Sequence, residues 1–191
     1  MVNLLSFSGD YGITTIVVLV WLSLYFIFVV WVFLYRYIRL SVLTRGEKEC
    51  LEDLLRGRNL LPRNSILNIN LGKIDKKPTE SMLQYSINKA IKDSTAGLTF
   101  LGIVASTAPF IGLFGTVVEI LEAFSKLGMD SKATLDVIAP VISKALIATA
   151  AGILTAIPAY SFNLVLKRKV FELNTYLQLQ INVLMSSKNE H

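Results

Sequence analysis

Three long apolar stretches dominate the pattern of this chain. Residues 11–35, 94–118 and 145–166 contain no Asp, Glu, Lys or Arg. A helix rises ~1.5 Å per residue and the hydrocarbon layer of a bilayer is ~30 Å thick, so about 20 residues suffice to cross it. Backbone amides in lipid must be paired within the protein, and the many short alternating segments of a membrane barrel do not occur in this sequence. The pattern therefore predicts an all-α membrane protein with three transmembrane helices.

The apolar stretches and their flanks divide the chain into seven segments. The first stretch is interpreted as a retained helix rather than a signal peptide, because it follows Asp10 and lacks a basic leader. In the tail, apolar residues recur at spacings of three and four, which predicts that the third helix continues beyond its span. We expect the second and third helices to be long and to extend into the cytoplasm. The expected segments are a short outer N-terminus at 1–12, transmembrane helices at 13–35, 94–118 and 144–166, a largely helical cytoplasmic segment at 36–93, an outer connection at 119–143, and a cytoplasmic helical tail at 167–191.

Positive charge indicates the orientation of the chain in the membrane. Twelve Lys and Arg residues lie in 36–93 and three in 167–169, whereas the N-terminal segment before the first span has none. Short loops rich in Lys and Arg stay in the cytoplasm. We therefore expect the N-terminus and the 119–143 connection outside and the C-terminus in the cytoplasm. The net charge of +5 then reflects topology, and no nucleic-acid partner is expected.

The three spans differ in the size of their side chains. Aromatic residues crowd the first span, which has neither Gly nor Pro, so we expect a peripheral helix that faces lipid. The second and third spans carry rows of small residues that let helix backbones approach closely, and they are expected to form the protein–protein surface. Each also contains a proline, which either bends the helix or only shapes its packing. The residues concerned are Ala108, Pro109, Gly112 and Gly115 in the second span and Ala148, Gly152, Ala156 and Pro158 in the third.

Few polar residues interrupt the second and third spans. Thr116 and Thr149 are expected at similar depth in the outer half, where they either form a hydroxyl collar in a ring of subunits or bond the carbonyl four residues earlier. Glu119 and Lys144 flank the mouth of the same pair of spans and either pair with each other or lie at the membrane surface. Proton relays need an intramembrane Asp, Glu or His, and the spans contain none. A titrating group for proton transfer would have to come from a partner.

The sequence offers little for catalysis or for cofactor and metal binding. Cys50 is the only cysteine and His191, the only histidine, is the last residue, so neither a disulfide framework nor a Cys/His metal site is expected. The chain also lacks a Walker-type phosphate loop and a Ser-His-Asp set. We therefore expect a protein that is not an enzyme and has no cofactor.

Three motifs occur in order across the second span, the outer connection and the third span. They are PFIGLFGTV at 109–117, ATLDVIAP at 133–140 and KALIATAAGILTAIPA at 144–159. This block, which covers about two residues in five, resembles the signature of the TolQ/ExbB/MotA family of proton-channel motor subunits. The resemblance is closer to TolQ and ExbB, because MotA proteins have four spans and a larger cytoplasmic domain.

The resemblance implies a ring in the inner membrane of a Gram-negative bacterium. In that family a pentameric homo-oligomer surrounds the single transmembrane helices of two copies of a TolR- or ExbD-like partner, whose aspartate carries protons. Force then passes through the periplasm, in the TolQ and ExbB systems by way of a TolA- or TonB-like protein. Thr116 and Thr149 match the pore-lining threonines of the family.

The resemblance has two departures and leaves several alternatives open. Lys144 stands where the family usually has a glutamate, and Val118-Glu119 replaces the usual Trp-Gly. One hypothesis is that the acid has moved to Glu119, with Lys144 as its counter-charge. A passive membrane scaffold without ion flow is the alternative function, whereas a substrate transporter would need an internal repeat that three unequal spans do not offer. The sequence does not distinguish a TolQ from an ExbB role, or H⁺ from Na⁺.

Overall fold

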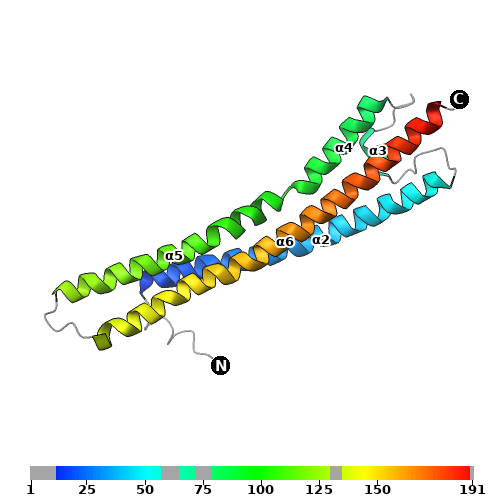
Figure 1. Ribbon diagram of the computed structural model, residues 1–191. Helices are drawn as coiled ribbons and strands as arrows, with labels where there is room; N and C mark the ends of the chain where they lie inside the picture. Colours follow the sequence, from blue (N-terminus) through cyan, green and yellow to red (C-terminus); the bar gives the residue numbers. More distant parts are fainter. Residues whose placement is uncertain (1–11, 57–64, 72–78, 130–134, 190–191) are drawn as a thin grey trace. The chain divides into compact units, whose positions relative to one another are not determined.

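The chain folds into helices, with no strand among the residues that the structure describes. The computed structural model describes residues 12–56, 65–71, 79–129 and 135–189. Three helices are long and apolar enough to cross a membrane, as the sequence predicts. The elements in chain order are α2 (Ile13–Leu55), α3 (Ile66–Leu71), α4 (Glu80–Thr95), α5 (Leu98–Met129) and α6 (Leu135–Asn189) (Figure 1).

The long helices extend well beyond the predicted spans. Helix α2 continues from the end of its apolar stretch at Tyr35 to Leu55, through Gly46. Helix α5 reaches Met129 and α6 begins at Leu135, so most of the connection expected at 119–143 is helical. Charged residues mark the edge of a hydrocarbon layer but are good helix formers. The first charge therefore does not end the helix.

A glycine turn separates α4 from α5 inside the stretch that was expected to be one helix from residue 94. Gly97 has a φ of +88°, a conformation that L side chains rarely adopt. A Cβ atom at this residue would lie 3.3 Å from Nε of Arg36. Arg36 donates from Nη1 to the carbonyl of Asp93 at 3.2 Å, and Asn163 donates from Nδ2 to the carbonyl of Leu98 at 2.6 Å. These bonds fix the turn to α2 and α6.

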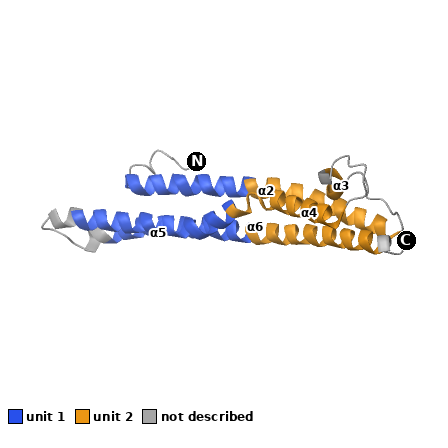
Figure 2. Ribbon diagram, turned by 90° about the horizontal axis from the view of Figure 1, so that it is seen from above, with its two compact units in different colours: residues 1–31, 100–162 blue, residues 32–99, 163–191 orange. Residues whose placement is uncertain are grey.

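The described residues fall into two compact units (Figure 2). Unit 1 comprises residues 1–31 and 100–162, and unit 2 comprises residues 32–99 and 163–191. Helices α2, α5 and α6 contribute residues to both units, whereas α3 and α4 belong to unit 2.

In unit 1, α2 packs through a narrow face and exposes the rest of its surface. Val18, Leu22 and Val29 are buried, whereas Trp21 and Trp31 are 52% and 60% exposed. Phe28 meets Phe100 of α5 edge to face, with ring centroids 5.0 Å apart. A membrane helix that packs on one face and presents bulky apolar side chains elsewhere suits contact with lipid.

Unit 2 has an apolar core to which the tail of α6 contributes one face. Leu173 and Leu177 are fully buried, and Leu40, Leu83 and Ile87 are nearly so. Burial of each such side chain from water contributes about 1.5–3 kcal/mol. Cys50 is buried as well, and its burial, followed by the nearby carboxylates of Glu47, Asp53 and Glu49, raises the pKa of its thiol.

A buried carboxylate ties α3 to α2 and α6 within unit 2. Glu47 of α2 accepts the backbone N–H of Ile66 at 2.7 Å, and its other oxygen accepts the amide of Gln180 at 2.8 Å and the hydroxyl of Ser65 at 3.1 Å. Ser65 and Gln180 are fully buried and Glu47 is 2% exposed. Buried polar groups of this kind must be satisfied, and this carboxylate satisfies donors from two other segments.

Candidate functional site in the α5 and α6 pair

Helices α5 and α6 approach each other closely at two glycines of unit 1. A Cβ atom added at Gly112 would lie 2.5 Å from the carbonyl oxygen of Ala148 and 3.0 Å from the Cα of Thr149. A Cβ atom at Gly152 would lie 2.6 Å from the carbonyl oxygen of Ala108. Ala108 and Ala148 are fully buried. Only glycine allows this backbone contact, and the structure places both small-residue rows in it.

The other small residues and the prolines surround this contact. A Cβ atom at Gly115 would lie 3.2 Å from both the Cβ of Ala148 and Cγ1 of Val18, so α2 packs here as well. Ala156 is buried. Pro109 and Pro158 are half-buried inside α5 and α6, which continue through them, and α6 contains a further proline, Pro140, that the sequence reasoning did not single out.

The two threonines meet between the helices. Oγ1 of Thr116 and Oγ1 of Thr149 are 2.5 Å apart, and Thr116 also lies 3.1 Å from the carbonyl oxygen of Ala145 and 3.3 Å from that of Gly112. The carbonyl of Ala145 is the one that Thr149 would bond within its own helix. Each hydroxyl has one proton, and when Thr116 donates its proton to a carbonyl, its oxygen can accept from Thr149. The hydroxyls thus join α5 to α6 instead of each only bonding its own helix.

Glu119 lies one turn beyond Thr116 and is buried. Its side chain is 5% exposed, and its Oε2 has no hydrogen-bond partner among the described residues. Its Oε1 lies 3.6 Å from the Cβ position of Gly12. Lys144 and Glu122 are near enough to interact with it electrostatically. The structure therefore brings the two predicted mouth residues, Glu119 and Lys144, into one electrostatic neighbourhood.

Sequence reasoning missed the residues that α2 contributes to this end of unit 1. Thr14 donates from Oγ1 to Oε1 of Glu122 at 3.4 Å. Thr15 is fully buried, and its hydroxyl has no partner among the residues that the structure describes. A signal was available: the first helix must begin on the side of the membrane where the second ends. Hydroxyls at the start of the first span therefore lie near residues 119–122.

The chemistry available at this site is that of hydroxyls and carboxylates. Thr116 and Thr149 form a hydrogen-bonded pair, and Glu119 offers an unpartnered carboxylate oxygen three residues beyond Thr116. No group of three or more His, Cys, Asp or Glu residues that could hold a metal ion occurs in the described ranges. The hydroxyls can donate and accept hydrogen bonds, and the carboxylate can take up a proton.

Comparison with known proteins identifies relatives along the whole chain. Residues 56–179 match the model of the MotA/TolQ/ExbB proton channel family. A Helicobacter pylori strain J99 protein named as an ExbB-like 1 biopolymer transport protein is 50% identical over 186 residues, which are 97% of this chain and 98% of that protein. The Tol-Pal system protein TolQ of Haemophilus influenzae is 46% identical over 83 residues, 44% of this chain and 36% of that protein.

A further relative matches a similar share of the chain. The biopolymer transport protein ExbB of Xanthomonas campestris pv. campestris strain B100 is 40% identical over 82 residues, 42% of this chain and 32% of that protein. The matching family model covers well over half of the chain, including α4, α5 and most of α6. The second and third apolar stretches and the threonine pair lie within the matched residues, whereas α2 precedes them. The chain therefore belongs to the MotA/TolQ/ExbB proton channel family.

Proposed function

We propose that this multi-pass membrane protein assembles into a homo-oligomeric, pentameric ring that conducts protons around the transmembrane helices of a single-span, TolR- or ExbD-like partner. The ring transmits the energy of the proton gradient to the periplasm or outer membrane, with a TolA- or TonB-like protein as the next component. Family membership and the three membrane-spanning helices support this proposal. It is a transport function and not an enzymatic one.

The composition of the spans is the observation that carries the proposal. Residues 13–35, 94–118 and 144–166 contain hydroxyls but no Asp, Glu or His. Proton relays within membranes run on intramembrane Asp, Glu or His side chains. In a proton-channel family, the missing carboxylate must then be supplied by a second protein. A partner helix with one aspartate meets this need with a single residue.

The threonine pair offers that partner hydroxyl groups for hydrogen bonding. The Oγ1 atoms of Thr116 and Thr149 are hydrogen-bonded at 2.5 Å, and Thr116 is also bonded to the α6 backbone. A hydroxyl can donate to a carboxylate and accept from a carboxylic acid. Thr149 would donate to an ionised partner aspartate with its proton turned away from Thr116, and would accept from a protonated one while it donates to Thr116. Thr149 is partly exposed, whereas Thr116 is buried. Thr149 is therefore the hydroxyl that faces the partner, and Thr116 orients it.

Glu119 and Lys144 form the outer mouth of the proposed pathway. The distribution of Lys and Arg favours an inner-membrane topology with the N-terminus and the α5 to α6 connection in the periplasm and the C-terminus in the cytoplasm. In this orientation Glu119 lies on the side from which protons enter. A buried carboxylate with one free oxygen is suited to accept them, with Lys144 as its counter-charge.

One observation favours the alternative of a passive scaffold without ion flow. The two hydroxyls already satisfy each other and the carbonyl of Ala145 within a single subunit. Hydrogen bonds between membrane helices contribute about 0.6 kcal/mol on average, which is a structural reason to keep both threonines. The two functions predict different results when a threonine is replaced by a side chain of the same size that has no hydroxyl.

The decisive experiment replaces Thr149 with valine, which keeps the shape and removes the hydroxyl. We expect intact assembly by native electrophoresis but a loss of proton-driven function, measured as proton flux into vesicles that hold the complex with its partner. The matched control is Thr155→Val, because among the described residues the Thr155 hydroxyl bonds only the carbonyl of Ala151 in its own helix, at 2.9 Å. Absence of proton flux in the native complex would favour the scaffold, and normal flux in Thr149→Val would show that conduction does not need the Thr149 hydroxyl.

A further inference from the structure

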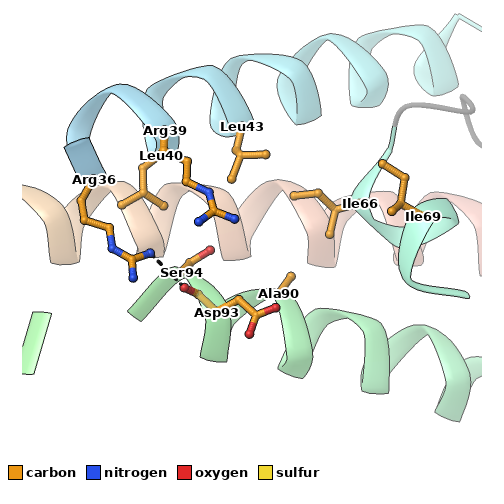
Figure 3. A pocket seen from close by; sticks show the side chains of 9 residues that line it. All are labelled: Arg36, Arg39, Leu40, Leu43, Ile66, Ile69, Ala90, Asp93 and Ser94. Carbon is orange, nitrogen blue, oxygen red and sulfur yellow. Dashed lines mark hydrogen bonds between the residues drawn. The ribbon is translucent and has the colours of Figure 1, made fainter. Parts of the chain in front are cut away.

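A pocket in unit 2 combines two arginines with an apolar floor. It has a volume of about 210 Å³ and lies between α2, α3 and α4. This is several times the ~30 Å³ that a water molecule occupies in the liquid. Figure 3 shows the side chains of Arg36 and Arg39 extending from α2 toward α4, with Arg36 bonded to the α4 backbone. The lining residues are Arg36, Arg39, Leu40, Leu43, Ile66, Ile69, Ala90, Asp93 and Ser94.

Two donors of this pocket have no partner in the part of the chain that the structure describes. Arg39 is exposed, and neither a hydrogen bond nor an ion pair joins its guanidinium to a described residue. The same holds for the hydroxyl of Ser94. Arg36 uses one N–H on the carbonyl of Asp93 at 3.2 Å and retains the other donors of its fork. The pocket therefore presents several unused N–H and O–H donors at one end.

The place of the pocket along the chain sets its depth in the membrane. Arg36 is the first charged residue after the apolar stretch 11–35, and Ser94 opens the apolar stretch 94–118. The headgroup layer adds about 6 Å to each side of the hydrocarbon, since a bilayer is ~30 Å thick without headgroups and about 40–45 Å with them. Arg39 is three residues, about 4.5 Å of helix, beyond Arg36. The donors therefore lie at headgroup depth.

We propose that this pocket binds the phosphate group of an anionic phospholipid of the surrounding bilayer. Guanidinium groups bind phosphate oxygens through paired, charge-assisted hydrogen bonds. A lower local dielectric beside the apolar floor strengthens these bonds. Basic pockets beside transmembrane helices are a known way of recognising anionic headgroups. Asp93, whose carboxylate also lines the pocket, opposes the binding of an anion and keeps it reversible.

The experiment measures lipid binding to the purified, assembled full-length protein by native mass spectrometry in detergent. The probe is phosphatidylglycerol, with phosphatidylcholine and inorganic phosphate as comparison ligands. We expect Arg39→Gln to weaken phosphatidylglycerol binding about tenfold or more, which corresponds to the loss of a charged hydrogen bond. Asp93→Asn, which removes the opposing charge, should strengthen it. Arg39 bonds no described residue, so thermal unfolding without added lipid should be unchanged in Arg39→Gln.

The matched control is Arg45→Gln, which removes the same charge from an exposed residue of α2 outside the pocket. Equal weakening by Arg45→Gln and Arg39→Gln would overturn the proposal, because binding would then reflect overall charge. Unaltered or weaker binding in Asp93→Asn would also count against it. If millimolar inorganic phosphate displaces the lipid, the pocket serves a soluble anion and the lipid assignment is wrong.

Discussion

Single atoms decide the packing of α5 on α6. At Gly112 and Gly152 even a methyl group would meet a backbone carbonyl of the other helix, at 2.5 Å and 2.6 Å respectively. Backbone atoms cannot move aside as a flexible side chain can. The helices themselves would have to separate, and the Thr116 to Thr149 hydrogen bond would lengthen with them.

We therefore predict that Gly112→Ala lowers stability by about 1–3 kcal/mol, the usual cost of overpacking. The measurement is thermal unfolding in detergent, followed by circular dichroism. The control is Gly46→Ala, because a Cβ atom at Gly46 meets no atom within 4 Å and alanine is the better helix former by about 1 kcal/mol. If Gly112→Ala unfolds at the same temperature as the native protein, the close approach of α5 and α6 is wrong.

At the scale of elements, the short helix α3 is stabilised by the Glu47 side chain of α2, because it is too short to be stable by itself. Six residues are too few to form a stable helix in isolation. Its first backbone N–H, at Ile66, is bonded to Glu47 at 2.7 Å, and the other oxygen of this carboxylate accepts bonds from Ser65 and Gln180. One residue of α2 thus fixes both the start of α3 and the register of α6.

We predict that Glu47→Gln destabilises α3 by about 1–3 kcal/mol, although the two side chains have nearly the same shape. Donors from three residues converge on the two carboxylate oxygens, and an amide would turn an N–H₂ group toward one of them. Hydrogen exchange at Ile66–Leu71 should become faster. Glu49→Gln, at an exposed residue of the same helix, should leave the exchange unchanged. Equal exchange in both variants would contradict the anchoring role of Glu47.

At the scale of the whole molecule, the proposed orientation depends on the distribution of charge. The segments proposed to be cytoplasmic carry most of the Lys and Arg residues, whereas the α5 to α6 connection carries few. Retention of basic segments in the cytoplasm is an electrostatic effect on insertion, and it operates before the tertiary structure forms.

We predict that alkaline phosphatase inserted within residues 130–134 is active and that green fluorescent protein fused to the C-terminus is fluorescent. Alkaline phosphatase is active only in the periplasm. Green fluorescent protein is fluorescent in the cytoplasm but not after the general pathway has exported it to the periplasm. Phosphatase fused to the C-terminus is the control and should be inactive. The reverse pattern of activities would show that the chain has the opposite orientation.

The sequence by itself determined the all-α fold, the three membrane-spanning helices and the family. Apolar runs of sufficient length leave a helix as the solution that satisfies backbone amides in lipid, and this holds whatever the neighbours are. The small-residue rows at Ala108 and Gly112 and at Ala148 and Gly152 likewise indicated that α5 and α6 could approach closely. These features are local, so a one-dimensional pattern contains them.

Only the tertiary structure decided which groups meet. The bond between Thr116 and Thr149, the carboxylate of Glu47 beside Ser65 and Gln180, and the pocket of Arg39 each join segments far apart in the chain. Their formation depends on the rotation of each helix about its axis and on the Gly97 turn, where a φ of +88° redirects the chain between α4 and α5. Residue spacing fixes which side chains share a helix face, but packing against a second helix selects the partner they face.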